Sequence, residues 1–442
     1  MEPRTLLANV PPGFVDAQIA SGLTSPTAID VAPDGRVFAA QQNGVIRVVQ
    51  NDQLLSAPFA DLSAAVDSSN ERGMLGLTID PFFDVNQYVY VYYTAKLPTA
   101  HNRISRFVAN GNVAAPGSET VLVDFPDMGS AIWHMGGAIH FGPDGKLYAG
   151  VGDHQQPNQS QLLTSVFGKI LRFNPDGSIP SDNPFYSSTT GTNRAIWCYG
   201  LRNPFTFSFQ PGTSRLFIND VGLDSWEEIN QGAAGANYGW PTTEGDFNQS
   251  SFPSFTRPIY AYPHSVGQCI AGATFYAPQS ATFPAQYYNK FFFVDFVQGF
   301  MKTIDPVTKV VSDFASALSF PTDAHVSASG AIYYLQRGMD TGEPTAGSGS
   351  LRKLDYVTST PPGVVQQPTD QSGAVGQQVT FAVSALGTSP LSYQWRQNGT
   401  NISGANGSTY SRTVTAGDAG AVFSCFVSNS FGQATSNGAT LT

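Results

Sequence analysis

Residues 135–153 read MGGAIHFGPDGKLYAGVGD, two short runs of strand-forming residues separated by a Pro-Asp-Gly turn and closed by Gly-Asp. A similar order of turns and short strands occurs in five further segments, residues 26–49, 73–94, 203–222, 272–305 and 320–356. A unit this small cannot bury its own apolar face, so the units must stack, and strands punctuated by turns favour a β-propeller over a solenoid. We therefore predict an all-β fold whose main part, residues 1–357, is a six-bladed β-propeller with a central channel.

The composition agrees with a tightly packed β protein. Of the 442 residues, 41% are hydrophobic and only 12% are charged, which leaves loops that are polar but uncharged. The formal net charge of -10 makes the surface repel polyphosphates, so we expect no nucleic-acid partner. No run reaches the length of a membrane-spanning helix, and the first residues lack a signal-peptide core. We expect a secreted or periplasmic protein whose leader is absent from this chain.

The composition changes beyond Tyr356, where a Thr/Ser/Pro linker (VTSTPPG) begins. Trp395 stands where an immunoglobulin-type sandwich buries its central Trp. Short alternating strands are expected over residues 379–385, 391–396 and 422–429. We predict a small immunoglobulin-like β-sandwich over residues 362–442. We expect it to act as a spacer or adhesion module, with contact to carbohydrate or a cell surface.

The three cysteines, Cys198, Cys269 and Cys425, are too few for a disulfide framework. A Cys198 to Cys269 bridge and two buried free thiols both fit the sequence, because unpaired Cys behaves as a small apolar residue. Val383 stands at the position facing Cys425, so we do not expect the inter-sheet disulfide of antibody domains.

His134 lies in the sequence WHMGG, where a loop enters an expected inner strand and side chains face the mouth of the channel. A neutral imidazole is suited to accept a proton near pH 7, which makes His134 a candidate general base. A structural loop histidine bonded to the backbone fits the same position.

The motif GLRNP enters the next inner strand and contains Arg202 and Asn203. Its donors suit a carboxylate or quinone oxygen, although an Arg paired with a local carboxylate has the same sequence. Residues 224–245 then carry several carboxylates and exposed carbonyls, the oxygen ligands that calcium accepts in irregular loops. The spacing is not that of an EF-hand, and a plain acidic loop is the alternative.

Several motifs occur in one order: ERGMLGLTIDPFF, HMGGAIHFGPDGKLYAGVGD, GKILRFNPDGSIPSDNPF, GLRNP, and EEIN followed by NYGWP. In this order they resemble the soluble glucose and aldose sugar dehydrogenases, the glucose/sorbosone dehydrogenase family, over roughly residues 13–356. The resemblance implies a six-bladed propeller that binds pyrroloquinoline quinone (PQQ) with calcium above the channel. It also implies oxidation of the anomeric hydroxyl of an aldose, or of a related polyol, to a lactone, with an external electron acceptor.

Matched position by position, the resemblance implies that His134 is the base that takes the sugar hydroxyl proton while hydride passes to the quinone. It implies that Arg202 and Asn203 contact the cofactor and that Asn158 falls close to a cofactor-contacting Gln.

The resemblance also implies two calcium ions. The main-chain carbonyls of Gly222 and Leu223 match the ligands of the calcium that polarises the quinone. Glu228 and Tyr238 match an acid and a carbonyl that hold a second, structural calcium.

The chain departs from the family pattern where the cofactor's carboxylates should bind. Family members carry a Lys on the fifth blade and two Arg on the sixth, whereas residues 296–299 (FVQG) and 320–323 (FPTD) contain no basic residue. Arg337 and Arg72 are the candidates to replace them. Trp133 stands where some relatives have a carboxyl group beside the base.

Three functions remain open at this stage. The first is a quinoprotein dehydrogenase of sugars. The second is a propeller without cofactor that binds carbohydrate or protein, which the missing basic residues and the second domain favour. The third is a calcium-dependent lactonase, because fold alone does not decide function; no suitable set of ligands is seen on successive inner strands of the sequence.

Overall fold

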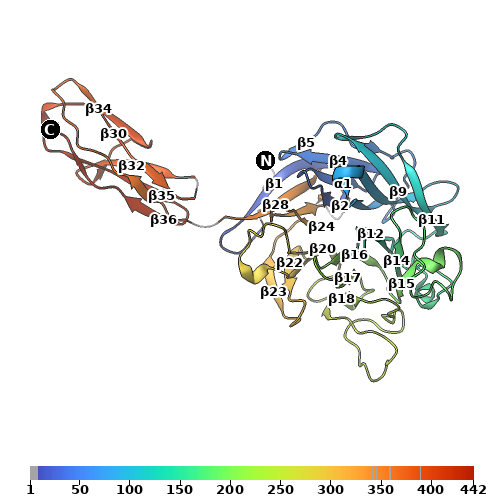
Figure 1. The fold of residues 1–442 in the computed structure, drawn as a ribbon. Helices are drawn as coiled ribbons and strands as arrows, with labels where there is room; N and C mark the ends of the chain where they lie inside the picture. Colours follow the sequence, from blue (N-terminus) through green and yellow to red (C-terminus); the bar gives the residue numbers. More distant parts are fainter. Residues whose placement is uncertain (1–7, 341–342, 345, 358–359, 389) are drawn as a thin grey trace. The chain divides into compact units, whose positions relative to one another are not determined.

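The computed structural model describes residues 8–340, 343–344, 346–357, 360–388 and 390–442. The chain divides into two compact units, with the boundary in the sequence between Tyr356 and Val357 (Figure 1). Strands dominate both units, and the described α-helix α1 (Phe83–Asn86) is a single turn. The predicted all-β fold is therefore confirmed. Among the described residues, no helix has the length and apolar character that a membrane crossing requires.

The first unit contains six antiparallel sheets of four or five strands in the described part of the chain, apart from the short pair β26 (Met339–Asp340) and β27 (Glu343–Pro344). Six innermost strands, here called the ring strands, are β2 (Pro26–Val31), β7 (Met74–Ile79), β12 (Gly136–Phe141), β16 (Pro204–Phe209), β20 (Ile270–Phe275) and β24 (Pro321–Val326). Each ring strand packs beside the next one, and β24 packs beside β2 (Figure 1). The sheets therefore close a circle, which is the arrangement of a β-propeller.

The outer strands follow each ring strand in chain order, except in the last sheet. The sheets are β2, β3 (Val37–Gln41), β4 (Val45–Gln50) and β5 (Gln53–Leu54), with β6 (Ala60–Asp61) beside β4; β7, β8 (Tyr88–Ala95), β9 (His101–Asn110) and β10 (Val113–Ala114), with β11 (Thr120–Asp127) beside β9; β12, β13 (Leu147–Val151), β14 (Lys169–Phe173) and β15 (Ile196–Tyr199); β16, β17 (Leu216–Asp220), β18 (Trp226–Gly232) and β19 (Tyr260–Pro263); β20, β21 (Phe291–Asp295), β22 (Phe300–Ile304) and β23 (Val311–Ala315); and β24, β25 (Ile332–Gln336), β28 (Gly349–Tyr356) and β1 (Phe14–Leu23).

The last sheet joins the two ends of the first unit, because β1 pairs antiparallel with β28. A buried ion pair lies across this junction, with Arg352 Nη2 at 2.7 Å from Asp16 Oδ2 and both side chains at most 2% exposed. The Tyr334 hydroxyl donates to Asp16 Oδ1 at 3.0 Å. The circle of sheets is thus closed by the pairing of β1 with β28 and by the buried Asp16 carboxylate, which binds Arg352 and Tyr334.

Neighbouring ring strands approach so closely that some positions admit only glycine. A Cβ on Gly76 would overlap the carbonyl oxygen of Gly137, and one on Gly272 would overlap the Cα of Asp323. Polar side chains also bridge the sheets, as when the Asp323 carboxylate accepts the Ile29 amide at 2.9 Å. These contacts fix the relative register of the ring strands.

The second unit is a set of short strands around Trp395. They are β29 (Gly363–Gln366) with β31 (Ser384–Leu386), β30 (Gln378–Ala382) with β34 (Thr409–Thr413), and a sheet of β33 (Thr400–Asn401), β32 (Ser392–Gln397), β35 (Val422–Asn429), β36 (Gly432–Thr435) and β37 (Ala439–Thr440). Trp395 is fully buried beside Phe381, and its indole donates to the Gly407 carbonyl at 3.1 Å. Cys198, Cys269 and Cys425 are free thiols, so the open alternative of a Cys198 to Cys269 bridge is excluded.

We predict that Arg352→Met destabilises the first unit by about 3 kcal/mol, because it leaves the Asp16 carboxylate buried without its cation. Chemical unfolding followed by intrinsic fluorescence measures this. The matched control is Lys353→Met on the same strand, whose partner Asp355 is 46% exposed, and we expect a loss below about 1 kcal/mol. Equal losses in the two variants would contradict the assigned role of the buried pair.

Candidate functional site

Loops that lead into and out of the ring strands gather at one end of the channel, here called the mouth. His134 lies two residues before β12, and Asp153 lies two residues after β13, its antiparallel neighbour. Arg202 lies two residues before β16, and the Asp153 amide donates to the Arg202 carbonyl at 2.7 Å. Antiparallel pairing therefore brings three polar residues from two sheets together.

The His134 imidazole is held at both nitrogens. Its Nδ1 lies 2.7 Å from Asp153 Oδ1, and its Nε2 lies 2.8 Å from Arg202 Nη2. A guanidinium only donates, so Nε2 is the acceptor, and the ring proton sits on Nδ1 facing Asp153. The Trp240 indole donates to the other Asp153 oxygen at 2.9 Å. This is a neutral imidazole with its lone pair at Nε2, the form that a general base requires.

The backbone at His134 is strained and closely packed. Its φ of 60° lies in the left-handed region, and its amide donates to Glu71 Oε2 at 2.5 Å. Burial raises the pKa of Glu71 above its ordinary value. A Cβ on Gly152 would overlap the His134 carbonyl oxygen, so only glycine fits there. Strain of this kind persists where the surroundings over-determine it, and it often marks functional sites.

The Arg202 side chain forms no ion pair with a carboxylate among the described residues. Its Nη1 donates to the Val221 carbonyl at 2.9 Å, and its Nε is buried without a partner. Asp220 instead accepts the Arg202 backbone amide at 3.0 Å, and burial raises the pKa of Asp220 to about 7. The guanidinium is therefore a desolvated cation with donor capacity to spare.

The other two predicted cofactor residues, Asn203 and Asn158, differ in burial and in hydrogen bonding. Asn203 is buried and its Oδ1 accepts the Gly136 amide at 2.9 Å, which supports the backbone beside His134. Asn158 is exposed in the 3-10 segment Pro157–Gln161, whereas Gln161 in that segment reaches Trp240 by donating to its carbonyl at 2.7 Å.

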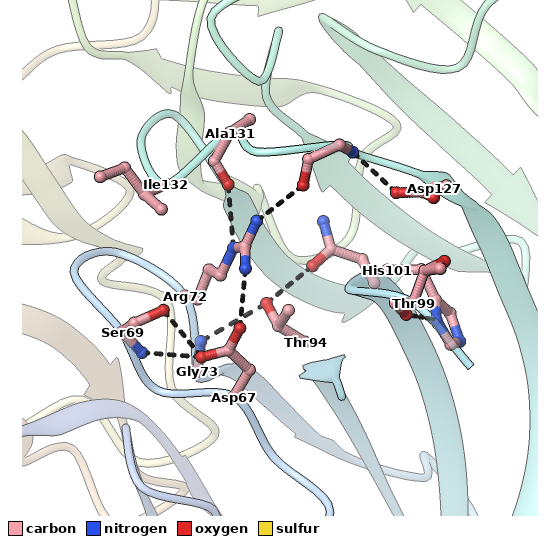
Figure 2. Close-up of polar contacts among 12 residues, drawn as sticks. Asp67, Ser69, Arg72, Gly73, Thr94, Thr99, His101, Asp127, Ala131 and Ile132 are labelled. Carbon is pink, nitrogen blue, oxygen red and sulfur yellow. Dashed lines mark hydrogen bonds and ion pairs between the residues drawn. The ribbon is translucent and has the colours of Figure 1, made fainter. Parts of the chain in front are cut away.

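Two arginines were candidates to replace the missing basic residues. Arg337 Nη2 donates to the neutral Gln42 side chain at 2.5 Å, and Arg337 forms no ion pair within the described ranges. Arg72 is fully engaged, because it binds Asp67 Oδ2 at 2.7 Å and the carbonyls of Ala131 and Gly129 at 2.9 and 3.0 Å (Figure 2). Arg337 is available for a ligand, and Arg72 holds two loops together.

The predicted calcium ligands lie in two places. Gly222 and Leu223 follow Val221 in the turn between β17 and β18, next to the carbonyl that binds Arg202. Glu228 is buried on β18, has no basic partner in the described chain, and accepts the Gly245 amide at 2.5 Å. Burial raises its pKa to about 8. Within the described residues, the Tyr238 carbonyl accepts a single hydrogen bond, a long one of 3.5 Å from the Thr243 hydroxyl.

Within the described ranges, no group of three or more His, Cys, Asp or Glu side chains lies close enough to hold a metal ion. The predicted calcium sites also use main-chain carbonyls, which lie outside such a side-chain group.

Sequence reasoning missed Asp153, Glu71 and Trp240. Trp133, expected in place of a carboxyl group beside the base, is 43% exposed, and the carboxylate at the imidazole comes from Asp153 instead. The Gly-Asp that ends the third repeat was a usable signal, because it follows the strand that pairs with β12. Glu71 lies in the motif ERGMLGLTIDPFF before β7, and Trp240 lies in the motif NYGWP after β18, but nothing local to either residue indicates that it reaches His134 or Asp153.

Lys169 anchors the loop that carries Gln161. Its buried ammonium donates to the carbonyls of Gln159, Ser160 and Phe167 at 3.0, 2.8 and 2.7 Å. Lys169 thus fixes three carbonyls of this loop, and Gln161 of the same loop bonds to the Trp240 backbone.

We predict that Lys169→Met lowers stability by about 2 kcal/mol, because it leaves the Phe167 carbonyl without a donor. The Gln159 and Ser160 carbonyls each lose one of two donors, since they also accept the Leu162 and Gly200 amides. Thermal unfolding measures the loss, and limited proteolysis should show cleavage within residues 157–167. Lys146→Met is the control, since Lys146 donates only to the Asn174 side chain and is half-buried. A variant as stable and protease-resistant as the control would refute the anchoring role.

A family model described as Glucose / Sorbosone dehydrogenase matches residues 23–302. The chain is 28% identical over 270 residues to Aldose sugar dehydrogenase YliI of Escherichia coli (strain K12), covering 59% of this chain and 69% of that protein. It is 29% identical over 262 residues to Quinoprotein glucose dehydrogenase B of Acinetobacter calcoaceticus, covering 53% of this chain and 54% of that protein. The chain thus spans only about half the length of the second relative.

Solved structures resemble the first unit. A putative oxidoreductase (glucose dehydrogenase) of Thermus thermophilus superposes with a TM-score of 0.68 and 26% identity, over 77% of this chain and 99% of that one. The PQQ-bound aldose sugar dehydrogenase of Streptomyces coelicolor gives a TM-score of 0.64 and 23% identity, over 78% of this chain and 99% of that one. The second likeness speaks for the fold alone.

Proposed function

The chain belongs to the glucose/sorbosone dehydrogenase family, and from that premise we propose that it is a quinoprotein oxidoreductase that converts the anomeric hydroxyl of an aldose, or of a related polyol, to a lactone. The observation that carries the proposal is the chain of contacts from Asp153 through His134 to Arg202. It provides an unprotonated ring nitrogen beside an unpaired cation, at the end of a channel.

We also propose the finer architecture. The six sheets of the first unit are six blades, and residues 362–442 are an immunoglobulin-like sandwich, which the buried Trp395 supports. A secreted or periplasmic location, an external electron acceptor and carbohydrate or cell-surface contact through the second unit belong to the same proposal.

The mouth suits a planar anion such as PQQ, which carries three carboxylates. Arg202 and Arg337 are cations without an ion pair among the described residues, and Arg202 Nε lacks any partner. At the positions expected to be basic, the rings of Phe296 and Phe320 lie 5.3 Å apart. We propose that two guanidinium groups hold the carboxylates and that this aromatic pair covers apolar surface of the ring system.

PQQ, when bound, supplies the two-electron acceptor for the hydride that leaves C1 of the sugar. The protein's own part is the proton. His134 Nε2 accepts it from the anomeric hydroxyl, and Asp153 then faces an imidazolium and stabilises its charge, while the C1–O bond becomes a carbonyl. Arg202 Nη2 now occupies the lone pair of Nε2, so the substrate hydroxyl must displace it. Substrate binding thereby releases the Arg202 Nη2 group, which can then bond to a carboxylate of the cofactor.

We propose that Gly222 and Leu223 offer carbonyls to one calcium ion and that Glu228 and Tyr238 hold a second. The chemistry of Glu228 supports this, because its buried carboxylate has no basic partner in the described residues. Hard cations with flexible oxygen coordination suit such a group.

We expect His134→Ala to lower kcat by about two to four orders of magnitude with little change in PQQ affinity, because only proton removal is lost. Dye reduction with an aldose panel measures turnover, and quinone absorbance measures binding. The control is His101→Ala, a second histidine bonded to an aspartate, Asp124 at 3.0 Å, but on outer strand β9. Undiminished turnover in the His134 variant would remove it from the mechanism.

Calcium should raise the melting temperature of the wild-type chain in a saturable way, since a ligand that binds only the folded state stabilises it. Glu228→Gln should abolish the part of this shift that comes from the second ion. Glu119→Gln, whose carboxylate accepts the Tyr93 hydroxyl on another sheet, should keep the full shift. A shift of wild-type size in the Glu228 variant would contradict the assignment of this ligand.

A further inference from the structure

A cavity of about 380 Å³ lies at the end of the ring strands opposite the mouth. His134 precedes β12, whereas the cavity is lined by His140 and Phe141 at the other end of that strand. With about 3.3 Å per residue, this places the cavity more than 10 Å from the mouth along the channel. Its volume falls within the range of small-molecule sites, about 300–1,000 Å³.

Six of the polar side chains that line this cavity share one feature, because each is the fifth residue of its ring strand. This far-end ring consists of Asp30, Thr78, His140, Ser208, Thr274 and His325. Alternate residues of a strand point to the same face, so equal register in all six strands gathers their side chains around one axis. Every ring strand thus contributes one polar side chain to the cavity at the same register position.

Asp30 organises one side of the far-end ring and has little capacity left for a ligand. Its Oδ2 accepts the Thr78 hydroxyl at 3.0 Å and the Ile79 amide at 2.9 Å. Its Oδ1 accepts the Val31 amide at 2.7 Å and lies 3.2 Å from His325 Nε2. A carboxylate saturated in this way is a poor cation ligand, and its negative charge disfavours an anion.

The other side of the far-end ring is open. Among the described residues, the His140 ring nitrogens and the hydroxyls of Ser208 and Thr274 have no hydrogen-bond partner in the protein, although all three side chains line the cavity. Burial lowers the pKa of His140 to about 4, so its imidazole is neutral near pH 7 and offers one donor and one acceptor. Three neighbouring strands thus present uncharged groups that both donate and accept.

We propose that the far-end ring binds a neutral polyhydroxylated molecule, a monosaccharide or cyclic polyol, through His140, Ser208 and Thr274. Each ligand hydroxyl donates and accepts, which matches these three groups. The half-buried Phe141 and Phe209 line the same cavity and suit the C–H faces of such a ring. This site goes beyond the proposed function, because it needs neither quinone nor calcium and shares no residue with the mouth.

The imidazoles provide a direct test, because the chain contains only six histidines. The full chain, without added quinone or metal, is titrated with myo-inositol and with D-glucose while ring-nitrogen NMR resonances are followed. The resonances of His140 and His325 are identified with His140→Gln and His325→Gln. We expect saturable shifts of these two resonances, with those of His101 and His264 unmoved, and the same response in His134→Ala.

Two isosteric or smaller variants test the assigned contacts. Thr274→Val and Ser208→Ala each remove one hydroxyl and should weaken binding of the probe about fivefold. Thr303→Val makes the same change at a buried position on β22, which does not line the cavity, and should bind like the wild type. Melting temperatures confirm that the variants are folded.

The proposal is overturned if neither probe moves the His140 resonance at concentrations up to the solubility limit. It is equally overturned if calcium chloride or sodium phosphate moves that resonance and the hydroxylated probes do not, because the site is then ionic. Loss of sugar turnover in His134→Ala with intact inositol binding separates this site from the proposed reaction.

Discussion

The closed circle of ring strands is the constraint on which the rest of the structure depends. Close approach of these strands excludes a Cβ at Gly76 and Gly272, and side chains such as Asp323 hydrogen-bond the backbone of the next strand. A shift of one strand by a single residue breaks these contacts and turns its polar side chains to the wrong face. The packed middle of the channel therefore fixes the register, and functional groups are confined to its two ends.

At the mouth, this register makes a neutral imidazole with a defined tautomer. Asp153 accepts a hydrogen bond from the Nδ1–H group, and Arg202 donates a hydrogen bond to the lone pair of Nε2. The close approach that requires Gly152 and the left-handed backbone of His134 belong to the same arrangement, since both bring two loops within hydrogen-bond distance. The free energy stored in this strain is offset by the backbone bond to Glu71 and by the surrounding sheets.

The sequence was sufficient for the all-β fold and for the proximity of His134 and Arg202, because both follow from repeats in which equivalent residues enter equivalent strands. It could not supply the contacts of Glu71 and Trp240, which lie in recognised motifs but reach His134 and Asp153 only through tertiary packing. The far-end ring was equally hidden, although His140 and Thr274 lie within the recognised repeats. Its six members are individually ordinary, and only a shared register across all ring strands makes them a group.

The two ends of the channel differ in a way that follows from charge. The mouth collects desolvated ions, including the cations Arg202 and Arg337, and such ions tolerate burial only when a counter-charge is nearby. In the described part of the chain neither side chain forms an ion pair, and the Glu71 carboxylate that attracts both lies beyond ion-pair distance. Two guanidinium groups against this one carboxylate are the basis of the anionic guest proposed above. The far end instead saturates its one carboxylate, Asp30, and leaves neutral groups such as His140 and Thr274 open. The ligands proposed for the two ends therefore differ in charge. One set of strands can carry both sites, because the two ends of each strand are independent in sequence but fixed relative to each other by the same register.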